Sequence, residues 1–195
     1  MGYLPATFQQ NQLLPSQKVF IYVGDITELK VDAIVNPTNP NLTNGGRGTA
    51  SAAILKEAGD ALEQDLLKRP TLVFGDAITT PSYLLPCNYV IHTAVPHVTQ
   101  GEETLRSCYR RCLEQLEGQR KESIAFPCMG TGVQGFDQER AAHIALSTVR
   151  NYIASDANDQ IKQFIFCLYS ITDKEIYQKI WPFYFQGPPQ NYLQL

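Results

Sequence analysis

Apolar residues recur along this chain in two alternating patterns. Short apolar runs predict strands at 18–23, 31–35, 73–79, 89–91, 123–126 and 164–169. Longer stretches, in which apolar residues return every three or four positions, predict helices at 51–67, 102–116, 140–153 and 173–181. Strands that alternate with helices of this length are typical of one α/β domain. We therefore expect a three-layer α/β/α sandwich around a mixed, largely parallel central sheet.

The two ends of the chain lack this alternation. Residues 1–16 are polar and contain Pro5 and Pro15, and the other end opens with Gly187-Pro188-Pro189. Proline and glycine interrupt regular structure. We expect flexible tails at 1–16 and 187–195 around a domain at 17–186.

Composition narrows the classes of partner. The chain has 195 residues and a formal net charge of −3, which gives no electrostatic case for nucleic-acid binding. No apolar run approaches the ~18 residues of a membrane span, and the N-terminus lacks the pattern of a signal peptide. The five cysteines include no Cys-x-x-Cys pair and are expected to be reduced thiols in an intracellular, monomeric protein. Cys108 and Cys112 would allow a metal site with a histidine, but we expect no metal and no cofactor.

Two glycine-rich loops each follow a predicted strand and precede a predicted helix. The first is Gly45-Gly46-Arg47-Gly48 and the second is Gly130-Thr131-Gly132-Val133-Gln134-Gly135-Phe136. Bare backbone N–H groups and a helix N-terminus favour an anion by about 0.3–1 kcal/mol per contact. Two such loops indicate a ligand with two phosphates, although neither matches a nucleotide fingerprint. The alternative is that these glycines only form tight turns.

Several segments resemble, in the same order, the motifs of the macrodomain family, the ADP-ribose-binding module. The likeness runs from about residue 18 to residue 182. The segments are Gly24-Asp25-Ile26-Thr27, Val35-Asn36-Pro37-Thr38-Asn39, Tyr89-Val90-Ile91-His92, Leu105-Arg106-Ser107-Cys108-Tyr109 and the two glycine loops. The resemblance implies an α/β/α fold that binds ADP-ribose, free or attached to proteins.

The resemblance also implies a role for individual residues. Asp25 would accept a hydrogen bond from the adenine amine, with Ile26 beside it, and Tyr169 would pack on the adenine ring. Asn39 would hold the distal ribose, and the two glycine loops would hold the diphosphate. Asn36 is expected to be structural, bonding backbone in a tight turn near Pro37. Alternatives remain open: Asp25 as a turn or cap residue, Tyr169 as packing, and Arg47 in contact with phosphate or with solvent.

The sequence favours binding over hydrolysis. The best-known hydrolase branch carries an aspartate in the stretch that corresponds to Gly48-Thr49-Ala50-Ser51-Ala52, which has no carboxylate. Ser51 can hydrogen-bond a water, but it is a poor general base without a partner. Gln134 replaces a common aromatic residue and resembles the macrodomain of macro-histone variants, which implies a nuclear, chromatin-bound reader; otherwise a cytoplasmic protein is expected. The alternatives are a hydrolase in which Asn39 positions the water, and an interaction module with a vestigial pocket.

Overall fold

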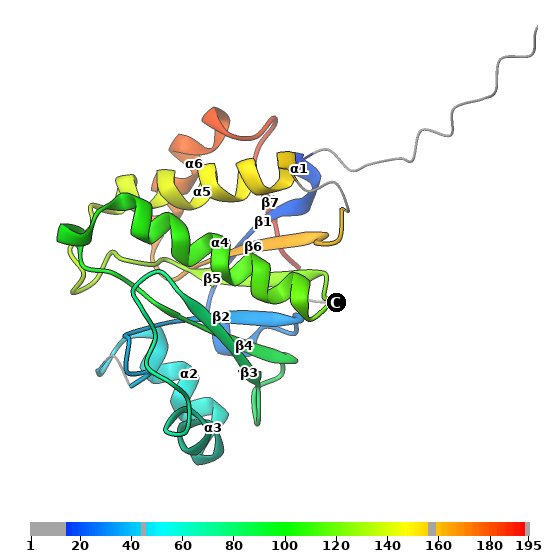
Figure 1. Cartoon of the computed structure of the whole chain (residues 1–195). Helices are drawn as coiled ribbons and strands as arrows, with labels where there is room; N and C mark the ends of the chain where they lie inside the picture. The colour runs from blue at the N-terminus through cyan, green and yellow to red at the C-terminus, as the bar shows by residue number, and fades with distance from the viewer. Residues whose placement is uncertain (1–14, 44–45, 156–158, 194–195) are drawn as a thin grey trace, which may run out of the picture.

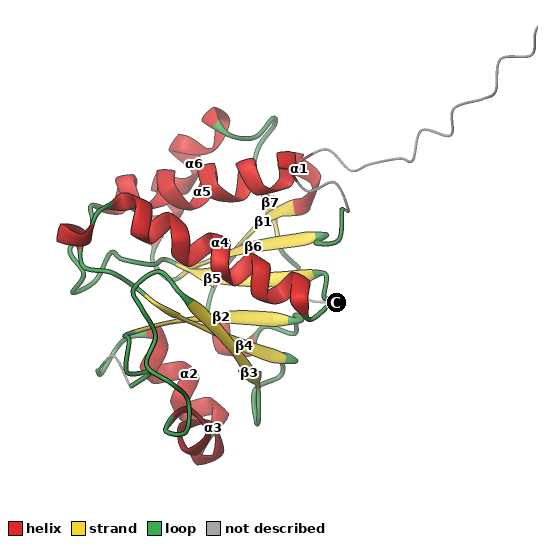
Figure 2. Ribbon diagram, in the orientation of Figure 1, coloured by secondary structure: helices red, strands yellow, loops and turns green. Residues whose placement is uncertain are grey.

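The computed structural model describes residues 15–43, 46–155 and 159–193 and forms a single seven-stranded sheet between helical layers (Figures 1 and 2). The strand order is β3-β4-β2-β5-β6-β1-β7. Neighbouring strands are parallel except β3 and β4, which are antiparallel. The strands are β1 (Val19–Val23), β2 (Ala33–Thr38), β3 (Ala77–Pro81), β4 (Tyr89–Ala94), β5 (Ser123–Pro127), β6 (Gln163–Leu168) and β7 (Gln190–Asn191).

Helices cover both faces of this sheet. One layer holds α4 (Glu102–Gly118), α5 (Gln138–Ser155) and α6 (Ile171–Ile180), and the other holds α2 (Ala50–Ala58) and α3 (Asp60–Leu66) (Figure 1). The remaining helical segments are α1 (Pro15–Lys18), η1 (Ile26–Glu28), η2 (Val98–Gln100) and η3 (Trp181–Phe183). No helix in the described part of the chain combines the length and apolar character needed to cross a bilayer.

The alternation of side chains along the strands produces two cores. On β6, Phe164, Phe166 and Leu168 belong to the cluster that packs under α4, α5 and α6. Ile165 and Cys167 point to the opposite face and join the cluster under α2 and α3. Because successive strand residues face opposite sides, a strand covered on both faces is apolar throughout. The predicted three-layer sandwich with a mixed, largely parallel sheet is confirmed.

Two predicted elements are corrected by the backbone. The single helix predicted at 51–67 is two helices, because Gly59 has a φ of 83°, a left-handed conformation that ends α2. The strand predicted at 73–79 begins only at Ala77. The Asp76 N–H donates to the Val73 carbonyl at 3.0 Å, which closes a turn before β3.

The ends of the domain extend further than predicted. Pro15 and Ser16 open helix α1 instead of belonging to a tail. Beyond Gly187-Pro188-Pro189, the chain adds β7 to the exposed edge of β1. The Tyr192 N–H then donates to the Ile21 carbonyl at 2.8 Å. The outer edge of β1 offers backbone N–H and C=O groups, as an edge strand does. Hydrogen bonds to these groups stabilise the segment that follows the prolines.

Candidate functional site

A cleft of about 540 Å³ opens at the carboxyl ends of the parallel strands β1, β5 and β6. This is the edge at which ligands bind in open α/β sheets. The lining residues come from the loop after β1, the first glycine loop with the start of α2, and the segments that end β5 and β6. They are Gly24, Asp25, Ile26, Arg47, Gly48, Thr49, Ala50, Ala52, Ala53, Lys56, Pro127, Cys128, Thr131, Cys167, Tyr169 and Asp173.

The N-terminus of α2 forms one wall of the cleft. Thr49 caps the helix: its Oγ1 accepts from the Ala52 N–H at 3.1 Å and donates to the Gly46 carbonyl at 2.8 Å. Ala50, Ala52 and Ala53 line the cleft in the first turn. Small side chains leave the helix end open, and its partial positive charge favours an anion there.

The first glycine loop contributes Arg47 and Gly48 to the cleft. Arg47 is exposed and lies along the wall of the cleft. From there its side chain can contact either a bound phosphate or solvent, the two alternatives expected for it. Gly46 is not among the residues that line the cleft, and Gly45 lies outside the described residues. Lys56 also lines the cleft, one turn after Ala52 and Ala53 on α2. It adds a second positive charge, which the sequence patterns did not indicate.

Ser51 lies behind the wall of the cleft instead of in it, which corrects its predicted place in the site. Its side chain is buried with Ile54, Leu55 and Ala58 on the core face of α2. Its hydroxyl has no hydrogen-bond partner among the described residues. The helical period explains the difference, since residues three and four apart share one face and Ile54 and Leu55 face the core.

Asn39 makes hydrogen bonds within its own turn, and Asn36 makes a contact other than the one expected. The Asn39 carbonyl accepts from the Asn41 N–H at 3.0 Å and its amide donates to Thr43 Oγ1 at 2.8 Å. Asn39 therefore closes its own turn, as asparagine does in Asx turns, and it does not line the cleft. Asn36 lies inside β2, not in a turn, and its amide is 3.0 Å from His92 Nδ1 instead of bonding backbone.

The second glycine loop folds over a buried aromatic ring. The Phe136 N–H donates to the Gly130 carbonyl at 3.0 Å, and the Phe136 side chain is 5% exposed and belongs to the core. Gly130 has a φ of 85°, and a Cβ there would lie 2.9 Å from the Phe136 ring. Of this loop, only Thr131 lines the cleft. The other predicted ligand residues lie outside the lining: Gly130, Gly132, Val133, Gln134, Gly135 and Phe136.

Asp25 and Ile26, from the loop after β1, and Tyr169, just after β6, also line the cleft. Asp25 Oδ1 accepts from the Thr27 N–H at 2.9 Å and from Thr27 Oγ1 at 2.7 Å, which caps η1. The cap leaves the second carboxylate oxygen of Asp25 with no partner among the described residues. Tyr169 is 85% exposed at the end of β6. An acceptor, an apolar side chain and an exposed aromatic ring together suit a heterocyclic base.

Sequence reasoning missed Cys128, Cys167 and Asp173. The Cys167 thiol donates to the Gly24 carbonyl at 3.3 Å, and burial raises its pKa to about 12. Burial raises the pKa of Cys128 further still, so neither thiol offers a thiolate at neutral pH. Cys128 and Cys167 lie at the carboxyl ends of β5 and β6, so the predicted strands could have indicated that they line the cleft. Asp173 carried none, because an acidic residue in a first helical turn is common for reasons of helix stability.

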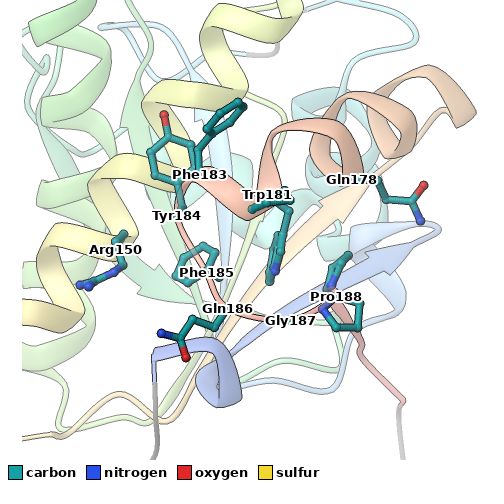
Figure 3. A pocket seen from close by; sticks show the side chains of 11 residues that line it. Arg150, Gln178, Trp181, Phe183, Tyr184, Phe185, Gln186, Gly187 and Pro188 are labelled. Atoms are coloured by element: carbon teal, nitrogen blue, oxygen red, sulfur yellow. The ribbon is translucent and has the colours of Figure 1, made fainter.

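A second hollow, of about 870 Å³, lies beside the C-terminal segment (Figure 3). It is lined by Arg150, Gln178 and the chain from Trp181 to Pro189. The Trp181 and Phe185 rings pack against each other there, with centroids 4.7 Å apart. Its lining includes neither glycine loop and no carboxyl end of a parallel strand.

Comparison with known proteins identifies the family of this architecture. A family model described as Macro domain matches residues 35–145. ADP-ribose glycohydrolase MACROD1 of Rattus norvegicus is 38% identical over 176 residues, which are 87% of this chain and 67% of that protein. In the Mus musculus protein of the same name, the match covers 53% of the length. The chain thus spans between about half and two thirds of these relatives.

Solved structures agree with the sequence comparison. The Trypanosoma brucei macrodomain in complex with ADP-ribose has a TM-score of 0.77 and 30% identity, covering 83% of this chain and 68% of that one. The Oceanobacillus iheyensis macrodomain with ADP has a TM-score of 0.75 and 33% identity, covering 83% of this chain and 88% of that one.

Proposed function

Because this chain belongs to the macrodomain family, we propose that it binds ADP-ribose, free or attached to a protein, in the cleft at the carboxyl ends of β1, β5 and β6. One observation carries the proposal. One cleft is lined both by Asp25 and Tyr169, which suit adenine, and by the capped N-terminus of α2, which suits phosphate.

Different lining residues bind different parts of the ligand. The free oxygen of the Asp25 carboxylate accepts from the exocyclic amine of adenine, and the Tyr169 ring covers one face of the base. Thr131 and the first turn of α2 hold the diphosphate, with Arg47 supplying the opposite charge. The distal ribose then lies toward the first glycine loop.

Recognition without cleavage is the activity we propose. The carboxylates that line the described part of the cleft are Asp25, after β1, and Asp173, in the first turn of α6. The first turn of α2, beside the proposed position of the distal ribose, presents Ala50, Ala52 and Ala53. A general base is therefore missing among the described residues where the reacting bond would lie. The chain acts as a reader of ADP-ribosylation.

Hydrolysis of protein-linked ADP-ribose is the second candidate. It is favoured by the 38% identity to ADP-ribose glycohydrolase MACROD1. A water held by Asn39 and activated by the phosphate of the ligand is the route that does not require a carboxylate. It requires the Asn39 side chain to leave its contacts with Asn41 and Thr43.

Two measurements test these proposals. A calorimetric titration with ADP-ribose is expected to show one-to-one binding, and the absence of any binding would leave only the interaction-module alternative. Incubation with a protein carrying radiolabelled ADP-ribose is expected to leave the label on the protein while the chain co-precipitates with it. Release of free ADP-ribose, above that of a Gly132→Glu control, would replace the reader with the hydrolase.

We further propose a chromatin setting for this reader, because the resemblance of Gln134 to macro-histone variants implies one. Nucleosomes that carry ADP-ribosylated histones are then expected to retain the chain, and unmodified nucleosomes are not. Equal retention on the two would contradict both the chromatin setting and the dependence on ADP-ribose.

A further inference from the structure

Asp173 is the second carboxylate of the cleft, and its orientation is fixed from within α6. The Ser170 hydroxyl donates to Asp173 Oδ2 at 2.7 Å, and the Asp173 N–H donates to Ser170 Oγ at 3.0 Å. Asp173 is half-buried and lines the cleft at the start of the helix. The side chain is therefore held in place before any ligand arrives.

The order of the strands is the basis on which we place Asp173 along the proposed ligand, together with its position beside Cys128 and Thr131. Strands β1, β6, β5 and β2 are neighbours in that order. Asp25 follows β1, Asp173 lies just beyond β6, Thr131 follows β5, and Arg47 lies on the loop after β2. Adjacent strands are about 4.8 Å apart, so each step across the sheet moves along the ligand by roughly one chemical group. Between the base at Asp25 and the phosphates at Thr131 comes the ribose of adenosine.

A fixed carboxylate at this position has a specific use. An ionised carboxylate only accepts hydrogen bonds, and two vicinal hydroxyls of a ribose are matched donors. Resting on the function proposed above, we propose that Asp173 holds the 2′- and 3′-hydroxyls of the adenosine ribose and so restricts the cleft to ligands in which that diol is unsubstituted.

The same charge rejects a 2′-phosphate. A phosphate monoester carries about −1.5 to −2 at neutral pH, and it would replace a hydrogen-bond donor by a second anion beside Asp173. The described cations of the cleft, Arg47 and Lys56, lie on the first glycine loop and on α2. Lys56 is also 2.8 Å from Glu57. The segment after β6 thus contributes no cation to the described lining, although the Lys56 charge also acts on Asp25.

The test compares three ligands by calorimetry: ADP-ribose, its analogue with a 2′-phosphate on the adenosine ribose, and its analogue lacking that 2′-hydroxyl. The wild-type chain is expected to bind both analogues at least ~10-fold more weakly than ADP-ribose. Asp173→Asn keeps an acceptor for Ser170 and removes the charge. This variant is expected to lose most of the discrimination against the phosphate. Glu175→Gln, an equal change of charge at an exposed site of the same helix, is the matched control.

The outcomes separate this inference from the function on which it rests. If ADP-ribose binds but wild type and Asp173→Asn show the same preference among the three ligands, the role of Asp173 is refuted while the cleft stands. An equal loss of discrimination in Glu175→Gln would also refute it, since a general field would then be responsible. If ADP-ribose itself does not bind the wild-type chain, both proposals fail. If Asp173→Asn does not fold, the titrations of the wild-type chain still test the inference, because equal affinity for all three ligands overturns it.

Discussion

The side-chain amide of Asn36 donates a hydrogen bond to His92 Nδ1 at 3.0 Å, across the middle of the sheet, where the two residues are paired in register on β2 and β4. On the other side of the ring, His92 Nε2 lies 2.9 Å from Thr80 Oγ1, which itself donates to the Pro81 carbonyl. His92 is therefore neutral, with its proton on Nε2, and the three side chains link β2, β4 and β3 in one buried chain of hydrogen bonds.

This arrangement predicts a stability that falls in acid. Burial lowers the pKa of His92 to about 3 in the folded protein, from an ordinary 6.5. Between these values the unfolded chain binds a proton that the native state excludes, so the free energy of unfolding decreases as pH falls from about 6.5 toward 3. Urea unfolding at pH 7 and pH 5 is expected to differ by about 2 kcal/mol from this group.

Replacing His92 isolates its contribution. His92→Leu is expected to destabilise the protein at pH 7 by about 2–3 kcal/mol, because Asn36 and Thr80 lose a buried partner. The difference in stability between pH 7 and pH 5 should shrink in this variant. His97→Gln, at an exposed position, is the control and should keep the wild-type difference. An unchanged pH dependence in His92→Leu would show that the histidine is not the titrating group.

Asp32 is predicted to stabilise the fold without affecting the cleft. Its carboxylate accepts from the Glu122 N–H, the Ser123 N–H and the Asn88 amide, which joins the starts of β2 and β5. Burial alone would raise the pKa of Asp32, but these hydrogen bonds and Lys121 lower it overall. The stabilisation is therefore complete above the unfolded pKa of about 4 and is lost as pH falls through the folded value.

Asp32→Ala is accordingly expected to cost about 2 kcal/mol in urea unfolding at pH 7. Its affinity for ADP-ribose at a temperature where it is folded should equal that of wild type, because Asp32 lies at the amino ends of the strands and the cleft at their carboxyl ends. A weakened affinity in fully folded protein would indicate that the two edges of the sheet are coupled.

The layers of the fold could be predicted from the sequence because their signals are local. A run such as Phe164–Leu168 is apolar on both faces and must be covered on both. The break at Gly59 and the strand at 190–191 could not be predicted in this way. Gly59 interrupts an apolar pattern that continues on both sides of it. The pairing of β7 depends on the edge of β1, which is distant in sequence: Gln190 pairs with Phe20, 170 positions earlier.

The candidate site was only partly predictable, for a related reason. Asp25 and Tyr169 closely follow the ends of β1 and β6, so their place at the edge of the sheet follows from the strand pattern. Ser51 and Phe136 stand inside the motifs but face the core, because the helical period and the closure of the second loop decide their direction. Asp173 belongs to the cleft only because α6 begins beside it, which a sequence pattern does not contain.

Gly132 offers a test of the second glycine loop. The nearest atom to a Cβ at this position would be Gln134 Oε1 at 3.8 Å, so a side chain fits the folded protein. Gly132 does not itself line the cleft, but it adjoins Thr131, which does. Gly132→Glu is expected to leave the melting temperature unchanged and to weaken ADP-ribose binding at least ~100-fold, because its carboxylate would lie beside the position proposed for the diphosphate at Thr131. Gly118→Glu, in an equally open place at the end of α4, adds the same charge as a control.

Gly130 should behave in the opposite way. A Cβ there meets the Phe136 ring at 2.9 Å and the backbone is left-handed, so Gly130→Ala is expected to destabilise the protein by about 1–3 kcal/mol. Thermal unfolding measures this cost. Wild-type affinity in Gly132→Glu, or wild-type stability in Gly130→Ala, would contradict the geometry assigned to this loop.

Asp25 caps η1 and is proposed to contact adenine, and one pair of variants can separate these two roles. Asp25→Asn keeps an oxygen to accept from Thr27, so η1 should stay capped and the melting temperature should not change. Its new NH₂ group would face the adenine amine donor to donor, and ADP-ribose should bind about 10-fold more weakly or worse. Asp25→Ala should lose the base contact and also about 1 kcal/mol of stability from the missing cap. Calorimetry and thermal unfolding on both variants distinguish the roles. Wild-type affinity in Asp25→Asn would leave Asp25 as a cap alone and would move the adenine contact elsewhere in the cleft.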